Sequence, residues 1–167
     1  MSSRFLAAVC VAVALAAAGC RMSDGPMPTP TSEDLNRLDD LRRDVGNVVG
    51  GNQDGRKDFA DDLQVFVTPG ARPEAPAAIN ELARLIADAA VASKLKEEAL
   101  PPLLKQVWVA VAARELSEKQ VATLQTDVRT TLAGLGVPEP SQQAISSQIV
   151  VVQKAVTARS RRWYEVF

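Results

Sequence analysis

The sequence of 167 residues predicts an all-α protein, a bundle of about five or six helices. From residue 32 onward, apolar side chains recur at steps of three and four, the spacing that places them on one face of a helix. Glycine and proline residues interrupt this pattern often enough to separate one helix from the next. No segment shows the alternation of apolar and polar residues that is typical of a half-buried strand. We therefore expect a single helical domain over residues 33–167.

The first two helices are predicted on either side of a glycine pair. Ser32 is the expected N-cap of the first helix, and Gly50 with Gly51 end it. Its apolar face consists of Leu35, Leu38, Leu41, Val45 and Val48. The second helix is expected to be short, from Asp58 to Val67. Its apolar face consists of Phe59, Leu63 and Phe66.

The next two helices should differ in how deeply they are buried. Residues 76–93 carry an apolar stripe with charged residues outside it, so this helix has one buried face. Pro101 and Pro102 suit the start of the fourth helix, where a missing N–H costs nothing. Residues 103–113 are apolar almost all round. The fourth helix is therefore expected in the middle of the bundle.

Serine residues mark the expected starts of the last two helices. Ser117 and Gln120 have the spacing of a capping box, and Leu116 with Val121 has the spacing of a hydrophobic staple. The fifth helix is expected to end at Leu132. Ser141 is the predicted cap of the sixth and longest helix, over residues 142–163, in which apolar residues recur at near-heptad spacing.

The first 20 residues predict a secretory signal. Arg4 supplies a positive charge, residues 5–18 are apolar, and Ala18 and Gly19 precede Cys20. As a helix, the apolar run would rise only about 21 Å, too short for a bilayer core of about 30 Å. The segment resembles the lipobox signal of bacterial lipoproteins. The resemblance implies that residues 1–19 are cleaved and that Cys20 carries lipid; a plain secretory signal that is cut elsewhere is the alternative.

Residues 20–32 are expected to form a flexible tether between the lipid and the domain. Three prolines and small polar residues leave this segment too little apolar surface to fold. The alternative is that the segment packs against the domain. Arg21 follows Cys20 where an aspartate would, by resemblance to enterobacterial lipoproteins, favour the inner membrane. We therefore expect anchoring in the membrane on its extracytoplasmic side, and in a Gram-negative cell on the periplasmic side of the outer membrane.

The composition excludes several kinds of chemistry. Histidine is absent, and the two cysteines, Cys10 and Cys20, both lie in the signal segment. Disulfides, thiol catalysis and histidine-dependent catalysis or metal binding are thereby excluded from the domain. With 19 basic and 20 acidic residues, the chain has no overall field that would attract nucleic acid. We expect no catalytic residue, no cofactor and no metal site, and we predict that the protein is not an enzyme.

Two segments of the domain give indications of its function, one as a candidate contact with a partner and the other through a resemblance. The C-terminal residues Arg161, Arg162, Trp163 and Tyr164 combine positive charge with aromatic rings, a combination that often dominates interfaces. Alternatively, Trp163 closes the core and the arginines complement the end of a helix. Residues 116–120, Leu-Ser-Glu-Lys-Gln, resemble the Leu-Thr-x-x-Gln motif of small helical periplasmic chaperones and metal-stress proteins, with serine in the threonine position.

Together these features predict a lipid-anchored envelope protein that acts as a non-enzymatic interaction or structural module. Its expected partners are the membrane, through Cys20, and another envelope protein or the cell wall. The alternative, which follows from the second resemblance, is a periplasmic chaperone-like or envelope-stress protein that shelters unfolded clients in an apolar groove.

Overall fold

The computed structural model describes residues 25–113 and 115–157, and this part of the chain is all-helical, with six α-helices and no strand. The predicted helical bundle of five or six helices is thus confirmed. The helices are α1 (Ser32–Val49), α2 (Asp54–Gln64), α3 (Ala75–Ser93), α4 (Pro101–Ala112), α5 (Glu118–Gly134) and α6 (Glu139–Val156), with a 3₁₀ turn at Glu97–Ala99.

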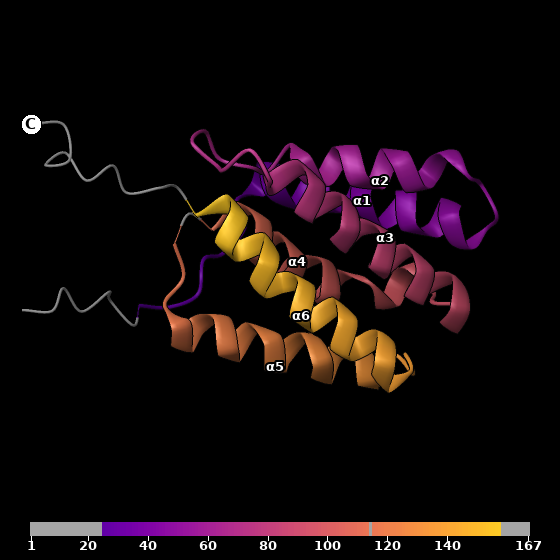
Figure 1. The fold of residues 1–167 in the computed structure, drawn as a ribbon. Helices are drawn as coiled ribbons and strands as arrows, with labels where there is room; N and C mark the ends of the chain where they lie inside the picture. Colours follow the sequence, from indigo (N-terminus) through magenta and orange to yellow (C-terminus); the bar gives the residue numbers. More distant parts are fainter. Residues whose placement is uncertain (1–24, 114, 158–167) are drawn as a thin grey trace, which may run out of the picture.

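Helix α4 organises the bundle. It packs against α1, α2, α5 and α6, while α3 packs against α1, α2 and α6. Figure 1 shows α1 and α2 as a helical hairpin along one edge, and α5 along the opposite edge. Helix α6 lies between α3 and α5, with α4 behind it. The core is therefore continuous across all six helices.

The burial of α4 follows from its composition. Pro101 and Pro102 occupy its first turn, as predicted, because the first N–H groups of a helix have no partner within it. Seven of its residues are buried, namely Leu103, Leu104, Val107, Trp108, Val109, Ala110 and Val111. A helix with apolar side chains on nearly every face is stable only where other helices surround it. The expectation that this helix lies in the middle of the bundle is confirmed.

The start of α1 differs from the prediction by one residue. Thr31, not Ser32, is the N-cap, and it forms a capping box with Asp34. The Asp34 amide donates to Thr31 Oγ1 at 3.2 Å, and Asp34 Oδ2 accepts from the Thr31 amide at 2.9 Å. Both residues can cap, but only Thr31 has an acidic side chain three positions later with which to complete the box. The hydrogen bond from Thr31 also lowers the pKa of Asp34.

Helix α2 begins four residues earlier than predicted, at Asp54, and ends at Gln64. Its first amide is held by Asn52, whose Oδ1 accepts from the Asp54 N–H at 3.0 Å. Gly55, a poor helix former, lies buried in the first turn of α2. A Cβ at this position would lie 3.0 Å from the carbonyl oxygen of Asp44 on α1. Gly55 therefore allows α1 and α2 to approach closely.

Helix α6 also departs from the prediction at both ends. It begins at Glu139, with Pro138 as its N-cap and Pro140 in its first turn, so Ser141 lies inside the helix and is not its cap. It ends at Val156, because Thr157 has extended backbone with φ −62° and ψ 117°. The predicted helix over residues 142–163 is therefore wrong at its C-terminal end. Trp163 lies outside the described residues.

Glutamine side chains link the helices across the core. Gln153 of α6 is 4% exposed, and its amide donates to the Ala110 carbonyl oxygen near the end of α4. Gln148 of α6 donates to the Ala78 carbonyl oxygen of α3 at 2.8 Å. Gln125 of α5 donates to the Ser146 carbonyl oxygen of α6 at 3.0 Å. The bond to Ala110 supplies a donor for a carbonyl in the last turn of α4, where the helix itself provides none, and the other two bonds add a second donor to carbonyls inside α3 and α6.

Two leucines of α1 provide a matched test of this packing. Leu41 is fully buried, whereas Leu35, predicted on the same apolar face, is 43% exposed. We expect Leu41→Ala to lower the free energy of unfolding by about 2–5 kcal/mol, because it leaves a cavity. Leu35→Ala should change it by about 0.5 kcal/mol or less. Urea denaturation of both variants measures the difference; equal losses would contradict the arrangement of α1 described above.

Candidate functional site

The residues predicted to anchor the chain and to contact a partner lie outside the described part of the structure. These are Cys20, Arg161, Arg162, Trp163 and Tyr164. The functional assignments made for them remain predictions. Among the described residues, no helix is long and apolar enough to cross a membrane. The same residues contain no group of three or more acidic side chains placed to hold a metal ion.

The motif at the start of α5 forms the predicted capping box. The Gln120 amide donates to Ser117 Oγ at 3.2 Å, and Gln120 Oε1 accepts from the Ser117 amide at 2.8 Å. The side chain of Gln120 makes a further contact that the sequence did not predict. Its Nε2 donates to the Gly25 carbonyl oxygen at 2.9 Å. One glutamine thus caps α5 and binds the segment that precedes α1.

The contact between Gln120 and Gly25 holds the C-terminal part of the predicted tether against the bundle. Residues 25–31 form neither helix nor strand, but Gly25 is bonded to Gln120 and Met27 packs against the core. In this described portion, the contacts favour the alternative in which the linker packs on the domain. The chain therefore approaches the bundle beside the first turn of α5.

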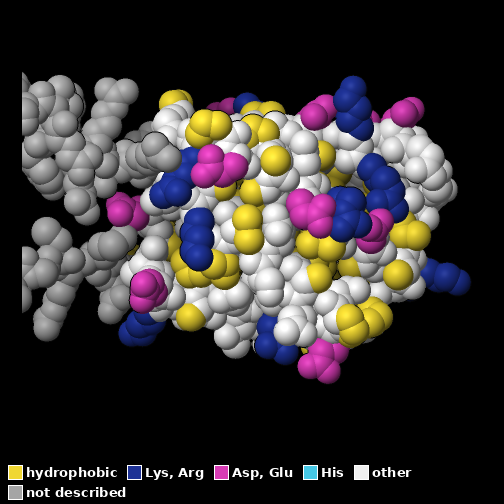
Figure 2. Space-filling model, viewed as in Figure 1, with side chains coloured by type: hydrophobic (Ala, Val, Ile, Leu, Met, Phe, Trp, Pro, Cys, Tyr) yellow, Lys and Arg dark blue, Asp and Glu magenta, His cyan; other side chains and the backbone are white. Residues whose placement is uncertain are grey.

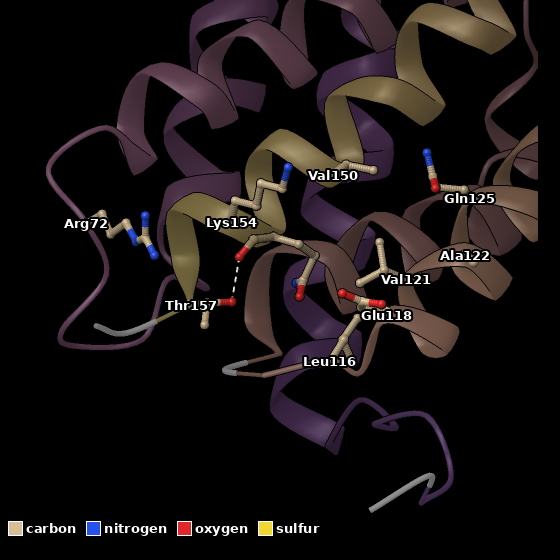
Figure 3. A pocket seen from close by; sticks show the side chains of 10 residues that line it. Arg72, Leu116, Glu118, Val121, Ala122, Gln125, Val150, Lys154 and Thr157 are labelled. Atoms are coloured by element: carbon tan, nitrogen blue, oxygen red, sulfur yellow. Dashed lines mark hydrogen bonds between the residues drawn. The ribbon is translucent and has the colours of Figure 1, made fainter. Parts of the chain in front are cut away.

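An apolar groove opens beside this point, between α5 and α6. It has a volume of about 330 Å³. We call it the α5–α6 groove, and its lining consists of Arg72, Leu116, Glu118, Val121, Ala122, Gln125, Val150, Gln153, Lys154 and Thr157. Figure 3 shows the labelled side chains of α5 on one side of the groove and those of α6 on the other. Thr157, the last described residue, lies at the end of the groove where α6 stops.

The groove exists because α5 is covered on one side only. Helix α5 packs on α4 and α6, and three of its residues are buried, namely Leu124, Val128 and Leu132. Val121 lies next to this buried stripe and is only partly covered. On the facing helix, Val150 is also partly covered, because its neighbours Ile149 and Val152 take the core positions. The groove is thus the space that one more packed side chain or ligand could fill.

The charges of the groove are divided between its two walls. Arg72 and Lys154 lie on the α6 side, and Glu118 lies on the α5 side (Figure 3). The Arg72 backbone amide donates to the Ala155 carbonyl oxygen at 2.9 Å, which ties the loop before α3 to the end of α6. Figure 2 shows both basic and acidic side chains set among apolar ones on the face of the molecule where α6 lies.

Sequence reasoning missed this groove. It interpreted Leu116 and Val121 as a staple at the start of a helix, and Val150 fell within the predicted helix over residues 142–163. The available signal was the Val150-Val151-Val152 triplet, which places more apolar residues on α6 than a single buried face can use. Only the packing of α5 against α6 shows where the additional apolar residues of α6 lie.

A cluster of acidic residues lies where α1 meets α2. In it, Asp44 of α1 lies near Asp62 and Asp58 of α2. Burial, and after it the neighbouring carboxylates of Asp62, Asp58 and Asp40, raise the pKa of Asp44 to about 6. Asp44 Oδ2 is buried and has no hydrogen-bond donor. We interpret this cluster as a local electrostatic cost of bringing α1 and α2 together.

Comparison of the chain with protein-family models, with curated proteins and with solved structures finds no match in any of the three. The functional argument therefore rests on the residues and the geometry described above.

Removal of the α5 cap tests the structural role of the motif. Ser117→Ala should lower the free energy of unfolding by about 1 kcal/mol, because the Gln120 amide loses its acceptor. Ser141 is the matched control, since it lies inside α6 and caps nothing. Ser141→Ala should cost clearly less in the same urea titration. An equal cost at both serines would show that the capping box does not contribute as described.

The raised pKa of Asp44 predicts a defined dependence on pH. The folded protein binds a proton at Asp44 below about pH 6, whereas an unfolded aspartate does so only below about pH 4. Stability contributed by this proton is present at pH 4 and is lost as the pH rises through 6. Asp44→Asn should therefore stabilise the protein at pH 7, and the gain should shrink as the pH approaches 4.

Thermal unfolding of both proteins at pH 4, 5, 6 and 7 measures this difference. Asp127→Asn, on the exposed side of α5 and away from the cluster, is the control for removing one surface charge. A gain from Asp44→Asn that stays constant over this pH range would rule out the raised pKa.

Proposed function

We propose that the chain is a lipid-anchored envelope protein that acts as a non-enzymatic interaction module. The observation that carries the proposal is the contact between Gln120 and Gly25, beside the α5–α6 groove. It joins the segment that follows the lipobox to one defined end of the folded bundle. An anchored module whose binding surface lies at a fixed place relative to the anchor is the function that this arrangement supports best.

The length of the remaining tether supports placement close to the membrane. Four residues, 21–24, separate Cys20 from Gly25, so the Cα atoms of Cys20 and Gly25 can lie at most about 17 Å apart when the chain is fully extended. A lipid on Cys20 would therefore hold the start of α5, and the groove beside it, within that distance of the headgroups. In this proposal the membrane is the outer membrane of a Gram-negative cell, with the bundle in the periplasm.

The composition supports a non-enzymatic role. The absence of histidine, and of cysteine after residue 20, removes the most frequent general base and the thiol nucleophile from the domain. The partner in this proposal is another envelope protein or the cell wall, and it would contact the surface of the membrane-anchored bundle.

The alternative is a chaperone-like or envelope-stress protein. Leu116, Ser117 and Gln120, which carry the resemblance to the Leu-Thr-x-x-Gln proteins, support it, and Leu116 lines the apolar groove. One observation argues against it. The large apolar side chains that are exposed among the described residues are distributed over α1, the end of α2, α3 and α6, namely Leu35, Val65, Val91 and Val151. Scattered side chains of this kind do not form the broad apolar face that an unfolded client requires.

Anchoring is tested by acyl labelling in cells. Cys20→Ser should abolish incorporation of labelled palmitate and release the protein from the membrane fraction. Cys10→Ser is the matched control, because it removes the other cysteine but leaves the lipobox intact, and it should retain both label and membrane association. Continued labelling of Cys20→Ser would refute the anchor.

The two classes of function are separated by mild crosslinking in intact cells, followed by recovery of the lipidated protein. One stoichiometric partner is expected for an interaction module. A broad set of unfolded proteins that increases under envelope stress would instead establish the chaperone-like alternative.

A further inference from the structure

Two apolar hollows lie on either side of the same pair of cations. The α5–α6 groove is the first, and a second hollow of about 370 Å³ lies between α3 and α6. Ala77 and Ala78 of α3 line the second hollow, together with Val151 and Ala155 of α6. Arg72 and Lys154 line both hollows. Glu74 also lines the second hollow, so an anion held at this pair would have apolar surface on both sides but would meet a carboxylate in the second hollow.

Both cations are available to a ligand. Within the described part of the chain, Lys154 makes no ion pair. Arg72 has one carboxylate within reach, Glu74, at 4.0 Å, the outer limit of an ion pair. Its Nε is buried and has no acceptor. The Arg72 backbone amide is bonded to the Ala155 carbonyl oxygen, which keeps the Cα of this residue beside the end of α6.

The shape of the groove favours a narrow apolar occupant. Leu116, Val121, Ala122 and Val150 provide apolar contact along its length. The side-chain amides of its two glutamines, Gln125 and Gln153, already donate to backbone carbonyls of the bundle. Glu118 on the opposite wall repels an anion there, so the charged end of a ligand is directed to the α6 side. A single acyl chain with an anionic headgroup satisfies both conditions.

We propose that the α5–α6 groove binds one acyl chain of an anionic membrane phospholipid, with the headgroup phosphate at Arg72 and Lys154. The source of the ligand, the membrane next to the groove, rests on the proposed anchoring at Cys20. The ligand chemistry rests on the groove itself and goes beyond the proposed function.

The experiment uses the chain from residue 20 with Cys20→Ser. All described helices lie after residue 31, so this chain retains the bundle. The probe is lysophosphatidylglycerol, titrated below its micelle concentration and followed by amide NMR shifts. Lysophosphatidylcholine of the same chain length is the matched ligand with no net charge. We expect saturable shifts at Val121, Ala122 and Val150, with tighter binding of the anionic lipid.

Variants separate the headgroup contact from the acyl contact. Lys154→Glu should weaken binding of lysophosphatidylglycerol by about tenfold or more, because it reverses the charge that meets the phosphate. Lys57→Glu, an equal change of charge on an exposed position of α2, should leave it unchanged. Ala122 is exposed at the edge of the groove, so Ala122→Trp should fill the groove and block both lipids without disturbing the core.

Three results would overturn the proposal. The first is the absence of saturable shifts in the groove with either lipid. The second is that lysophosphatidylglycerol and lysophosphatidylcholine bind with equal affinity, both to the unaltered chain and to the Lys154→Glu chain. The third is saturation of the same resonances by an amphipathic Leu- and Glu-rich peptide but not by lysophosphatidylglycerol, which would make the groove a peptide site. Since the protein used carries no lipid, these results do not depend on acyl labelling at Cys20, which tests the proposed function separately.

Discussion

The burial of α4 is the constraint on which the rest of the bundle depends. A helix with apolar side chains around nearly its whole circumference has no stable place at a surface, so α1, α2, α5 and α6 must cover it. Burial also removes water from its C-terminal carbonyl groups. Gln153 of α6 replaces that water at Ala110, which ties the position of α6 to that of α4. The α5–α6 groove lies where this covering layer is incomplete.

Much of this fold could be predicted from the sequence, because each helix carries its own apolar period and its own start and stop residues. The central place of α4, the capping box at Ser117 and the buried faces of α2 and α3 follow from such local patterns. The errors occurred where a local rule had two solutions. Thr31 and Ser32 can both cap a helix, and only the acidic residue at position 34 decides between them. Likewise, Pro138 and Pro140 suit a first turn as well as they suit a loop before Ser141.

The candidate site was less accessible to sequence reasoning, because it depends on how elements far apart in the chain meet. Arg72 precedes α3, Leu116 precedes α5 and Lys154 is near the end of α6, and no spacing rule connects them. Gly25 reaches Gln120 across a separation of 95 residues. The lipobox resemblance, in contrast, is local and could be identified from the first 20 residues alone. The tether was predicted from a local sequence pattern, whereas the groove beside it could be found only from the three-dimensional packing.

The glutamine contacts have a consequence for the surroundings in which the fold can persist. Gln125, Gln148 and Gln153 join α3, α4, α5 and α6 through neutral amides, which neither titrate nor lose strength when dissolved ions screen charges. In the envelope location proposed above, the protein would meet acidity and salinity that follow the external medium. Helices linked in this way keep their mutual positions through such fluctuations, so the groove they form would keep its shape when the medium changes.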